Sequence, residues 1–499
     1  MGSKCQPGAC EGSKAIQGEA VLEDANCNPQ PENEKQEYRA RRLFVGAMAV
    51  CVLIWVALYN GYPTVFSDTG GYLLTGKYFA ALPPFRAPGY AFFTRLASLG
   101  ISAWFTIATQ AVIVVYVLHE TCEYLTDDDR EFGGLYFLAS VCVLSALTSL
   151  PWLVSLLMPD VFAGVLFLSA FLLAFADKLS PLRRIVLAAI FTISAAAHNS
   201  LLPIAALFVV AALILRIVSR PPQGFSATRS VLAWLLVPIL AAGLSTAALN
   251  QQTGLGFHLS PSRNSFLLAR LFGDGLAGDF LRENCPTQNF ISCGYLSDLP
   301  ETQEEFLFQH PLFDELIKGH QEEMGKIIRG TLLAYPVRFT ISSAKETLLQ
   351  LASLRTGDEI RTYGAKEWNS QVIPLVYPSD SQAFLNGRQY HDRLTTVADA
   401  SGSADTTVFW LSVATCLFLA WTGRFSRINL FFYSAIAFLV INASVCATFA
   451  GVYDRYQGRV AWILPFCLTA YVCCWARAWK RWTPLEKLEE IEEMEAPVN

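Results

Sequence analysis

Residues 43–58, LFVGAMAVCVLIWVAL, form an uninterrupted apolar run that leads directly into the polar stretch 59–72, YNGYPTVFSDTGGY. The run approaches the length that a helix needs to cross a hydrocarbon core of about 30 Å. A lone carboxylate, Asp68, then stands in a Gly- and Tyr-rich turn at the expected membrane surface. This junction indicates a membrane-spanning helix that is followed by a candidate functional residue, Asp68.

The rest of the chain repeats the same pattern. Hydrophobic residues make up 53% of the 499 residues and charged residues only 16%, well below the roughly 25% of a soluble domain. Apolar runs occur at about 43–60, 101–120, 135–150, 160–176, 185–198, 201–217, 230–249, 406–423, 428–449 and 459–476. The sequence therefore predicts an all-α polytopic membrane protein with about ten, and up to twelve, transmembrane helices.

The spacing of these runs predicts the division of the chain into domains. Residues 1–42 are polar and lack the apolar core of a signal peptide, which indicates a disordered tail. An N-terminal transmembrane module, 43–249, contains a first outer loop at 61–100. A large segment, 250–405, separates the seventh run from the eighth, and a second transmembrane module, 406–476, precedes a short tail, 477–499.

The distribution of Lys and Arg predicts the orientation. With an even number of spans and the N-terminus inside, sixteen basic residues flank the inner ends of the spans and only five lie in the short outer connections. Basic residues are enriched in cytoplasmic loops. Both termini are therefore predicted to be cytoplasmic, and segment 250–405 exoplasmic.

Cysteine usage agrees with this orientation. Of thirteen cysteines, only Cys285 and Cys293 lie in the outer segment, as CPTQNFISC. An isolated pair on the oxidising side of a membrane is either a disulfide or two unpaired thiols, and the sequence favours the disulfide. The net charge of −5 is small and gives no indication of a nucleic-acid partner.

Polar residues next to the span ends gather on the predicted outer side, and ionisable residues at membrane depth indicate a functional site. These residues are Asp68, Asp160, His198, Asn199, Tyr453, Asp454, Arg455 and Arg459, and Arg86 lies in the first outer connection as a further candidate. Each has a structural alternative: the two carboxylates could be helix N-caps, His198 an interfacial histidine, and the late arginines lipid anchors. Together, two carboxylates and two arginines suit a reaction that deprotonates a hydroxyl group and expels a phosphate.

Three short motifs carry a family resemblance: SDTGGYL at 67–73, FRAPGYAFFTRL at 85–96, and Pro159–Asp160 before the fourth run. Their order resembles the GT-C class of integral-membrane glycosyltransferases, such as protein O-mannosyltransferases and the lipid A aminoarabinose transferase. In that class an acidic residue in the first outer loop is the catalytic base. Two features depart from the class: Thr69 follows Asp68 where many members have a second acid, and members often have more spans.

The resemblance implies a polyprenyl-phosphate sugar as donor and an exoplasmic lipid, glycan or protein as acceptor, and we expect an inverting transfer. Segment 250–405 contains no Asn-x-Ser/Thr sequon, which favours a multi-pass protein of a bacterial inner membrane. Asp68 would be the base, and Asp160 would orient the acceptor, support the base or help to hold a divalent metal. Arg455 or Arg459, with Arg86, would stabilise the leaving phosphate. Tyr72, Tyr90 and Tyr453 would pack on a sugar ring or belong to the aromatic belt, and His198 would contact substrate. No cofactor is certain.

Two other classes of function stay open. A secondary transporter or flippase for a lipid-linked or anionic substrate would place ionisable residues near mid-membrane on broken helices. The predicted spans carry few charges at their centres, which disfavours this class. A non-catalytic subunit of an envelope-assembly complex would instead use segment 250–405 as its interaction surface.

Overall fold

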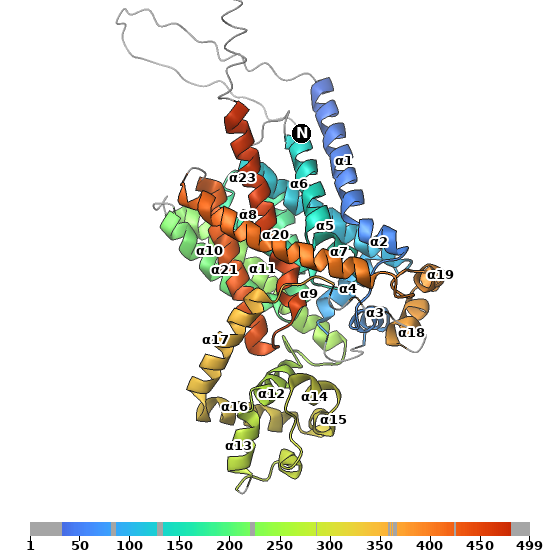
Figure 1. The fold of residues 1–499 in the computed structure, drawn as a ribbon, viewed down its shortest axis with the longest axis vertical. Coiled ribbons are helices and arrows are strands. Elements are labelled where there is room, and N and C mark those ends of the chain that lie inside the picture. The colour runs from blue at the N-terminus through green and yellow to red at the C-terminus, as the bar shows by residue number, and fades with distance from the viewer. Residues whose placement is uncertain are drawn as a thin grey trace, which may run out of the picture. The chain divides into compact units, whose positions relative to one another are not determined.

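The computed structural model describes residues 32–80, 86–126, 133–219, 225–285, 287–357, 360, 362, 367–423 and 426–480. Within these ranges the secondary structure is helical, apart from one parallel bridge between Thr64 and Leu156. The chain divides into two units, 1–43 and 44–499, and the features discussed below belong to the second unit. Figure 1 shows the arrangement of its helices.

All ten predicted apolar runs lie in helices. These are α1 (Glu32–Leu53) with α2 (Trp55–Asn60), α5 (Ala103–Thr126), α6 (Gly133–Leu147), α8 (Val161–Phe175), α9 (Pro181–Ala197), α10 (Leu201–Ser219), α11 (Phe225–Gln252), α20 (Thr395–Trp421), α21 (Ser426–Phe449), and α22 (Asp454–Ala461) with α23 (Ile463–Lys480). The first and last runs are each divided into two helices, at Ile54 and Trp462. The all-helical fold expected from the sequence is therefore confirmed for the described residues.

Six stretches in the described part are long and apolar enough to cross a membrane. They are Ala103–Thr126, Leu201–Ser219, Ser230–Gln252, Thr395–Trp421, Ser426–Phe449 and Asp454–Arg477. Two further apolar helices, at 134–147 and 161–175, are shorter; at 1.5 Å per residue, fifteen residues extend only about 22 Å. The structure thus has the helices of an α-helical multi-pass membrane protein, and the number of ten spans stays a prediction.

Helix α8 is the centre of the apolar core. All fifteen of its residues, from Val161 to Phe175, are buried, as expected for a helix that is apolar on every side. It packs against α5, α9, α10, α11 and α21, and Phe167 and Phe171 contact the Phe431 ring of α21 edge to face. This position fixes the N-terminal end of α8, where Asp160 stands.

Two predicted boundaries fall inside helices. The predicted tail ends at residue 42, but α1 runs without a break from Glu32 to Leu53; residues 1–31 lie outside the described part, as do residues 481–499 of the second tail. The predicted limit at 405 likewise falls within α20. Asp405 is fully buried in this helix and accepts a hydrogen bond from Thr356 Oγ1 at 2.6 Å.

Segment 250–405 contains two packed parts. The first is a small helical module with its own apolar core, seen at the lower end of Figure 1. It consists of α12 (Arg263–Gly273), α13 (Leu276–Asn284), α14 (Gln303–Phe308), α15 (Pro311–Gly319) and α16 (Gln321–Ala334). Cys285 and Cys293 form a disulfide there, with a Cα–Cα distance of 5.5 Å, which confirms the predicted pairing.

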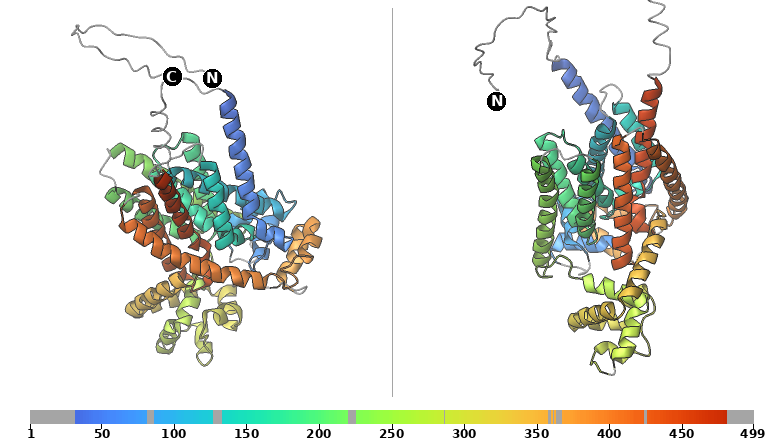
Figure 2. Two further views of the ribbon diagram at one scale, coloured as in Figure 1. Left: turned by 45° about the horizontal axis from the view of Figure 1, so that its top comes forward. Right: turned by 90° about the vertical axis from the view of Figure 1, so that its left-hand side faces the viewer.

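The second part returns to the membrane helices. Helix α17 (Pro336–Ala352) packs along α21, and α18 (Trp368–Val376) packs on α3 (Thr69–Tyr78). Asp380 accepts hydrogen bonds from Ala103 N and Ser102 Oγ, both at 2.9 Å, at the start of α5. In both views of Figure 2 the segment around α18 and α19 (Ser381–Leu385) lies beside the first helices of the unit. Residues 367–392 thereby form a wall against the loop that carries Asp68.

Candidate functional site

Asp68 occupies the N-cap position of α3, but its side chain does not cap that helix. The carboxylate instead forms an ion pair with Arg86, which precedes α4 (Pro88–Ala97), and lies 3.6 Å from Arg455 Nη1. Its side chain is 15% exposed. The alternative that Asp68 is an N-cap is therefore wrong for this structure, and the carboxylate is directed at two arginines.

Asp160 repeats this arrangement at the start of α8. It stands at the N-cap position, but its side chain makes no capping hydrogen bond. One oxygen, Oδ1, lies 3.7 Å from Arg455 Nε and 3.9 Å from Arg459 Nη1. Both carboxylate oxygens are buried without a hydrogen-bond partner. Because the side chain makes no capping hydrogen bond, the N-cap alternative is wrong here as well. Burying a carboxylate without hydrogen bonds costs free energy unless charged neighbours or a ligand compensate it.

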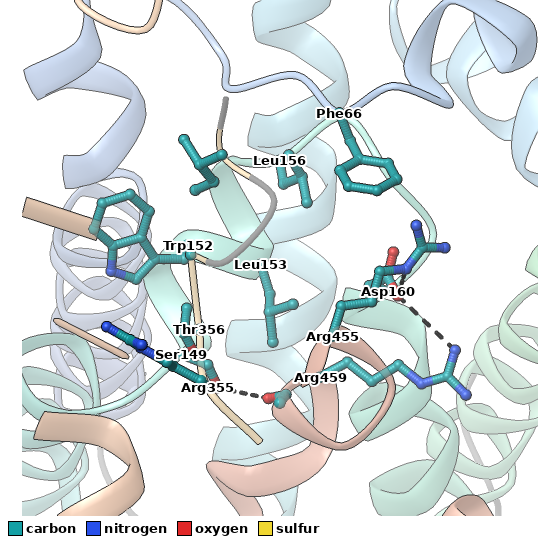
Figure 3. A pocket seen from close by; sticks show the side chains of 13 residues that line it. Phe66, Ser149, Trp152, Leu153, Leu156, Asp160, Arg355, Thr356, Arg455 and Arg459 are labelled. Atoms are coloured by element: carbon teal, nitrogen blue, oxygen red, sulfur yellow. Dashed lines mark hydrogen bonds and ion pairs between the residues drawn. The ribbon is translucent and has the colours of Figure 1, made fainter. Parts of the chain in front are cut away.

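Arg455 and Arg459 lie one helical turn apart on the short helix α22 (Figure 3). The Arg459 side chain is 0% exposed, and its Nη2 donates to Asn442 Oδ1 at 2.8 Å and to Ser200 Oγ at 3.1 Å. The Arg455 guanidinium lies over the Phe66 ring, 4.5 Å from its centroid. Burial of Arg459 excludes the alternative that this side chain anchors lipid headgroups at the membrane surface.

These five charged side chains form one connected group, which we call the site cluster: Asp68, Arg86, Asp160, Arg455 and Arg459. It unites four segments that are up to about four hundred residues apart in the chain. Three guanidinium groups face two carboxylates, so the cluster carries a surplus of one positive charge. In a mostly buried site such a surplus favours an anionic ligand.

A pocket of about 560 Å³, open space at its mouth included, adjoins the cluster. Asp160, Arg455 and Arg459 line its charged side, and apolar side chains line the rest (Figure 3): Phe66, Trp152, Leu153, Leu156 and Ile360. The remaining lining residues are Ser149, Arg355, Thr356, Gly357 and Gly458. The pocket therefore offers a charged surface beside an apolar one, the pattern that an amphipathic anion would need.

Tyr72 lies in the core beside the cluster and is 1% exposed. Its ring meets that of Tyr90 edge to face, with centroids 5.2 Å apart, and Tyr90 Oη donates to Gln110 Oε1 at 2.7 Å. Burial raises the pKa of the Tyr72 hydroxyl well above its ordinary value. Neither tyrosine is exposed as an aromatic belt requires, and neither lines the pocket.

His198 and Tyr453 lie close to the cluster without joining it. His198 Nδ1 accepts a hydrogen bond from the backbone N–H of Ser200 at 3.2 Å, and Ser200 Oγ in turn contacts Arg459. Tyr453 packs edge to face on Tyr456, at a centroid distance of 5.6 Å, and its backbone is held by the Gln350 side chain. The structure thus relates both residues to the arginines of α22 rather than to the pocket.

Two sets of supporting residues were not predicted from the sequence. Asn442 accepts a hydrogen bond from Arg459 and donates one to Tyr456 O of α22 at 2.7 Å. Because it is an amide within the apolar run 428–449, the sequence does indicate a buried polar role for it. Asn369 and Gln389 hold the backbone around Asp68. Their positions in a polar, loop-rich segment gave no such signal.

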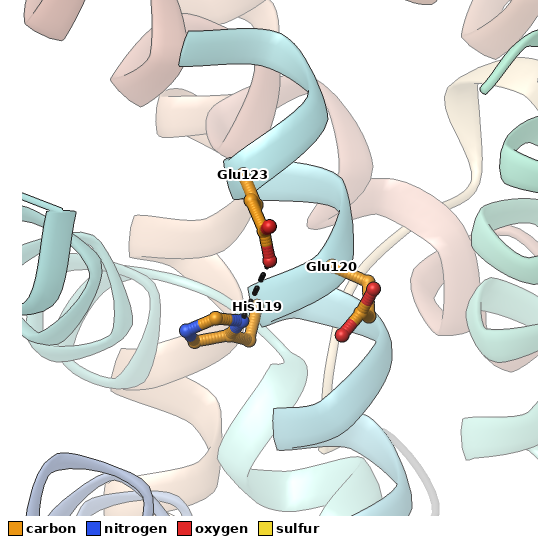
Figure 4. Close-up of side chains that lie close together, drawn as sticks. All are labelled: His119, Glu120 and Glu123. Atoms are coloured by element: carbon orange, nitrogen blue, oxygen red, sulfur yellow. Dashed lines mark ion pairs between the residues drawn. The ribbon is translucent and has the colours of Figure 1, made fainter. Parts of the chain in front are cut away.

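Two groups of side chains in the described residues contain the carboxylates that a metal ion would need. Among the described residues, His119, Glu120 and Glu123 on α5 bring ligand atoms within 4.8 Å of one another (Figure 4). Arg183 Nη1 lies 3.3 Å from Glu120 Oε2 and 3.0 Å from Glu123 Oε1, so a cation of the protein already occupies these carboxylates. In the site cluster, both carboxylates face guanidinium groups, so its donor set does not suit a resident divalent cation.

The chain matches no protein-family model, no curated protein and no solved structure. Its function is therefore inferred from the geometry of the site cluster and the pocket.

Proposed function

We propose that the protein is a membrane glycosyltransferase of the GT-C type, which moves a sugar from a polyprenyl-phosphate donor to an exoplasmic acceptor. The observation that carries this proposal is the site cluster itself: two carboxylates and three arginines beside a pocket with an apolar wall. A polyprenyl phosphate has the complementary chemistry, since an anionic group is joined to an apolar chain.

The two carboxylates receive different roles because their exposure differs. Asp68 is 15% exposed and Asp160 only 4%, so an acceptor arriving from water reaches Asp68 more easily. Asp68 takes the proton of the acceptor hydroxyl group as its oxygen attacks the anomeric carbon. Asp160 holds Arg455 and Arg459 in place. The new bond forms on the face opposite the phosphate, which inverts the anomeric configuration.

The arginines act on the leaving group. As the bond between the anomeric carbon and the phosphate oxygen breaks, the electron pair remains on the phosphate, which gains negative charge. Arg455 and Arg459 line the pocket where this phosphate would lie, and a planar guanidinium can donate two hydrogen bonds to phosphate oxygens. Arg86 adds a third cation next to Asp68. Hydrogen-bond donors that are held in place around the negative charge of a transition state usually make the largest single contribution to such catalysis.

The cluster also bears on the competing functions. Asp68 and Asp160 stand at the N-terminal ends of α3 and α8 rather than at mid-helix, and the predicted orientation places both on the exoplasmic side. A transporter site would instead lie near the middle of the membrane. A non-catalytic assembly subunit would not need a positively charged pocket, so binding of a lipid phosphate separates it from the proposed enzyme.

A binding experiment tests the proposal directly. The purified protein in detergent is mixed with a polyprenyl phosphate or with the matching uncharged polyprenol, and the bound lipid is measured by native mass spectrometry. We expect selective binding of the phosphate, and weaker binding by the Arg455→Lys/Arg459→Lys variant, because an ammonium group cannot reproduce the bidentate geometry. Equal binding of both lipids by the wild type would contradict the proposal.

A further inference from the structure

The N-terminus of α3 is capped from a distant part of the chain. The first N–H groups of a helix lack partners within it and are usually capped by the side chain at the N-cap position. Asp68 occupies that position in α3 but makes no such bond. The N–H of Gly70 donates instead to Asn369 Oδ1 at 2.8 Å, across 299 residues of sequence. Asn369 thus supplies the cap that Asp68 does not.

Asn369 holds both sides of Asp68. Its Nδ2 donates to the carbonyl oxygen of Phe66 at 2.6 Å, two residues before Asp68, while Gly70 lies two residues after it. The Asn369 side chain is buried, with the residue 1% exposed. A single rigid amide therefore fixes the backbone on each side of the carboxylate.

Glycine at position 70 is required for this approach. A Cβ atom there would overlap the Trp368 ring and the Asn369 amide oxygen. Thr69 completes the turn, because its Oγ1 accepts from Phe66 N at 2.9 Å and donates to Leu157 O at 3.1 Å. The SDTGGYL motif is therefore built to receive Asn369 from α18.

We propose that Asn369 is a positioning residue: by capping α3 in place of Asp68, it keeps the Asp68 carboxylate directed at Arg86 and Arg455. Without Asn369, the N–H of Gly70 loses its partner, and Asp68 has the residue type and position that favour capping it. The carboxylate would then turn from the arginines toward its own helix. The catalytic part of this inference rests on the proposed glycosyl transfer.

The capping exchange can be tested without any enzyme assay. A double-mutant cycle compares the unfolding stability of wild type, Asp68→Ala, Asn369→Ala and the double variant in detergent. If Asp68 caps α3 only when Asn369 is absent, the two substitutions are not additive, because Asp68→Ala removes the contacts with Arg86 and Arg455 in the wild type but the cap of α3 in the Asn369→Ala background. Additive effects would overturn the capping exchange.

The catalytic consequence needs a transfer assay with polyprenyl-phosphate-sugar lipids extracted from a deletion strain. We expect Asn369→Ala to lower kcat by about 10- to 100-fold while polyprenyl-phosphate binding is unchanged, because the pocket arginines are untouched. Asp380→Asn is the matched control: it loosens the same segment at α5 without touching the backbone around Asp68, and should keep kcat.

The outcomes separate the two proposals. Normal kcat in a folded Asn369→Ala variant, with an active wild type, would overturn the positioning role alone. An inactive wild type that binds polyprenol and polyprenyl phosphate equally would overturn the proposed function, and the stability cycle would still decide whether Asn369 replaces Asp68 as the cap.

Discussion

Two groups of charges in the described part of the chain are built on opposite plans. One is the site cluster; the other, which we call the Arg270 cluster, consists of Arg270, Asp274 and Glu346 at the junction of α12, α17 and α21. In the Arg270 cluster, the central guanidinium forms an ion pair with Asp274, lies 2.7 Å from Glu346 Oε2 and donates to Ala447 O at 3.1 Å. Two carboxylates surround one guanidinium there.

The site cluster reverses these features. Its arginines outnumber its carboxylates, its Arg455 and Arg459 contacts are longer, at 3.6–3.9 Å, and it opens into a pocket. Short, enclosed contacts join parts of a fold, whereas loose contacts around a surplus charge leave capacity for a ligand. Both clusters bury charge and both leave one charge over, so the sign of the surplus and the adjoining pocket distinguish the site cluster from the Arg270 cluster.

Removing the carboxylate charge of Asp68 should have the largest effect. Asp68→Asn keeps the size and hydrogen-bonding capacity of the side chain but cannot accept the acceptor's proton, so we expect a loss of about 10²–10⁴-fold in transfer rate. Surface glycans and lipid-linked sugars in a deletion strain that carries the variant provide the measurement. Near wild-type transfer at equal membrane abundance would remove Asp68 from catalysis and leave Asp160 as the candidate base.

In the Arg270 cluster, the corresponding change should affect stability and not chemistry. Arg270→Met leaves the buried Asp274 and the partly exposed Glu346 without their cation, which costs about 3 kcal/mol of unfolding free energy, the lower end of the range for a fully buried pair. The control is Arg282→Met in the same module, because Arg282 is 60% exposed and pairs with Asp279 at the surface; such pairs contribute at most about 1 kcal/mol. Similar unfolding midpoints for both variants would refute the structural role of Arg270.

The sequence predicted the helices well because each apolar run satisfies its own backbone locally, whatever it packs against. The exceptions depended on partners that lie elsewhere in the chain. The stretch 395–405 falls in the predicted outer segment, yet it is part of α20, where Thr356 donates a hydrogen bond to the buried Asp405. Likewise, α8 is too short to match a typical span and is enclosed by other helices instead.

The sequence predicted the charged residues of the site but not the residues that position them. The motifs around Asp68, Arg86, Asp160 and Arg455 identified all members of the site cluster, because charges next to span ends stand out in an apolar sequence. The roles of Asp68 and Asp160 as N-caps could not be decided from sequence, since capping depends on which groups compete for the helix N–H. Asn369 was out of reach for the same reason: it caps a helix 299 residues away.

The disulfide should contribute less than the Arg270 cluster. Cys285 and Cys293 close a loop of only eight residues, so its removal by Cys→Ser changes at both positions should cost about 2 kcal/mol. Alkylation after denaturation without reductant, followed by mass spectrometry, should label the free thiols Cys51 and Cys142 but neither Cys285 nor Cys293. Labelling of the pair would show that the bond does not form.

The smallest expected effect is the contribution of Glu346, in the Arg270 cluster, to the pH dependence of stability. Burial raises the pKa of Glu346 to about 7; Arg270 offsets part of this increase and Asp274 adds to it. In the unfolded chain a glutamate titrates near about 4.3, so between these two values the folded protein retains a proton that the unfolded chain has released. The free energy of unfolding should therefore fall as the pH rises from about 4.3 to about 7, and level off above. Glu346→Gln carries no such proton, so its stability should change less over this window, as chemical unfolding at pH 5 and pH 8 can measure. An equally steep decline in the free energy of unfolding of the variant would assign the pH dependence to other groups. It would also mean that Glu346 carries its charge in the folded protein throughout this pH range.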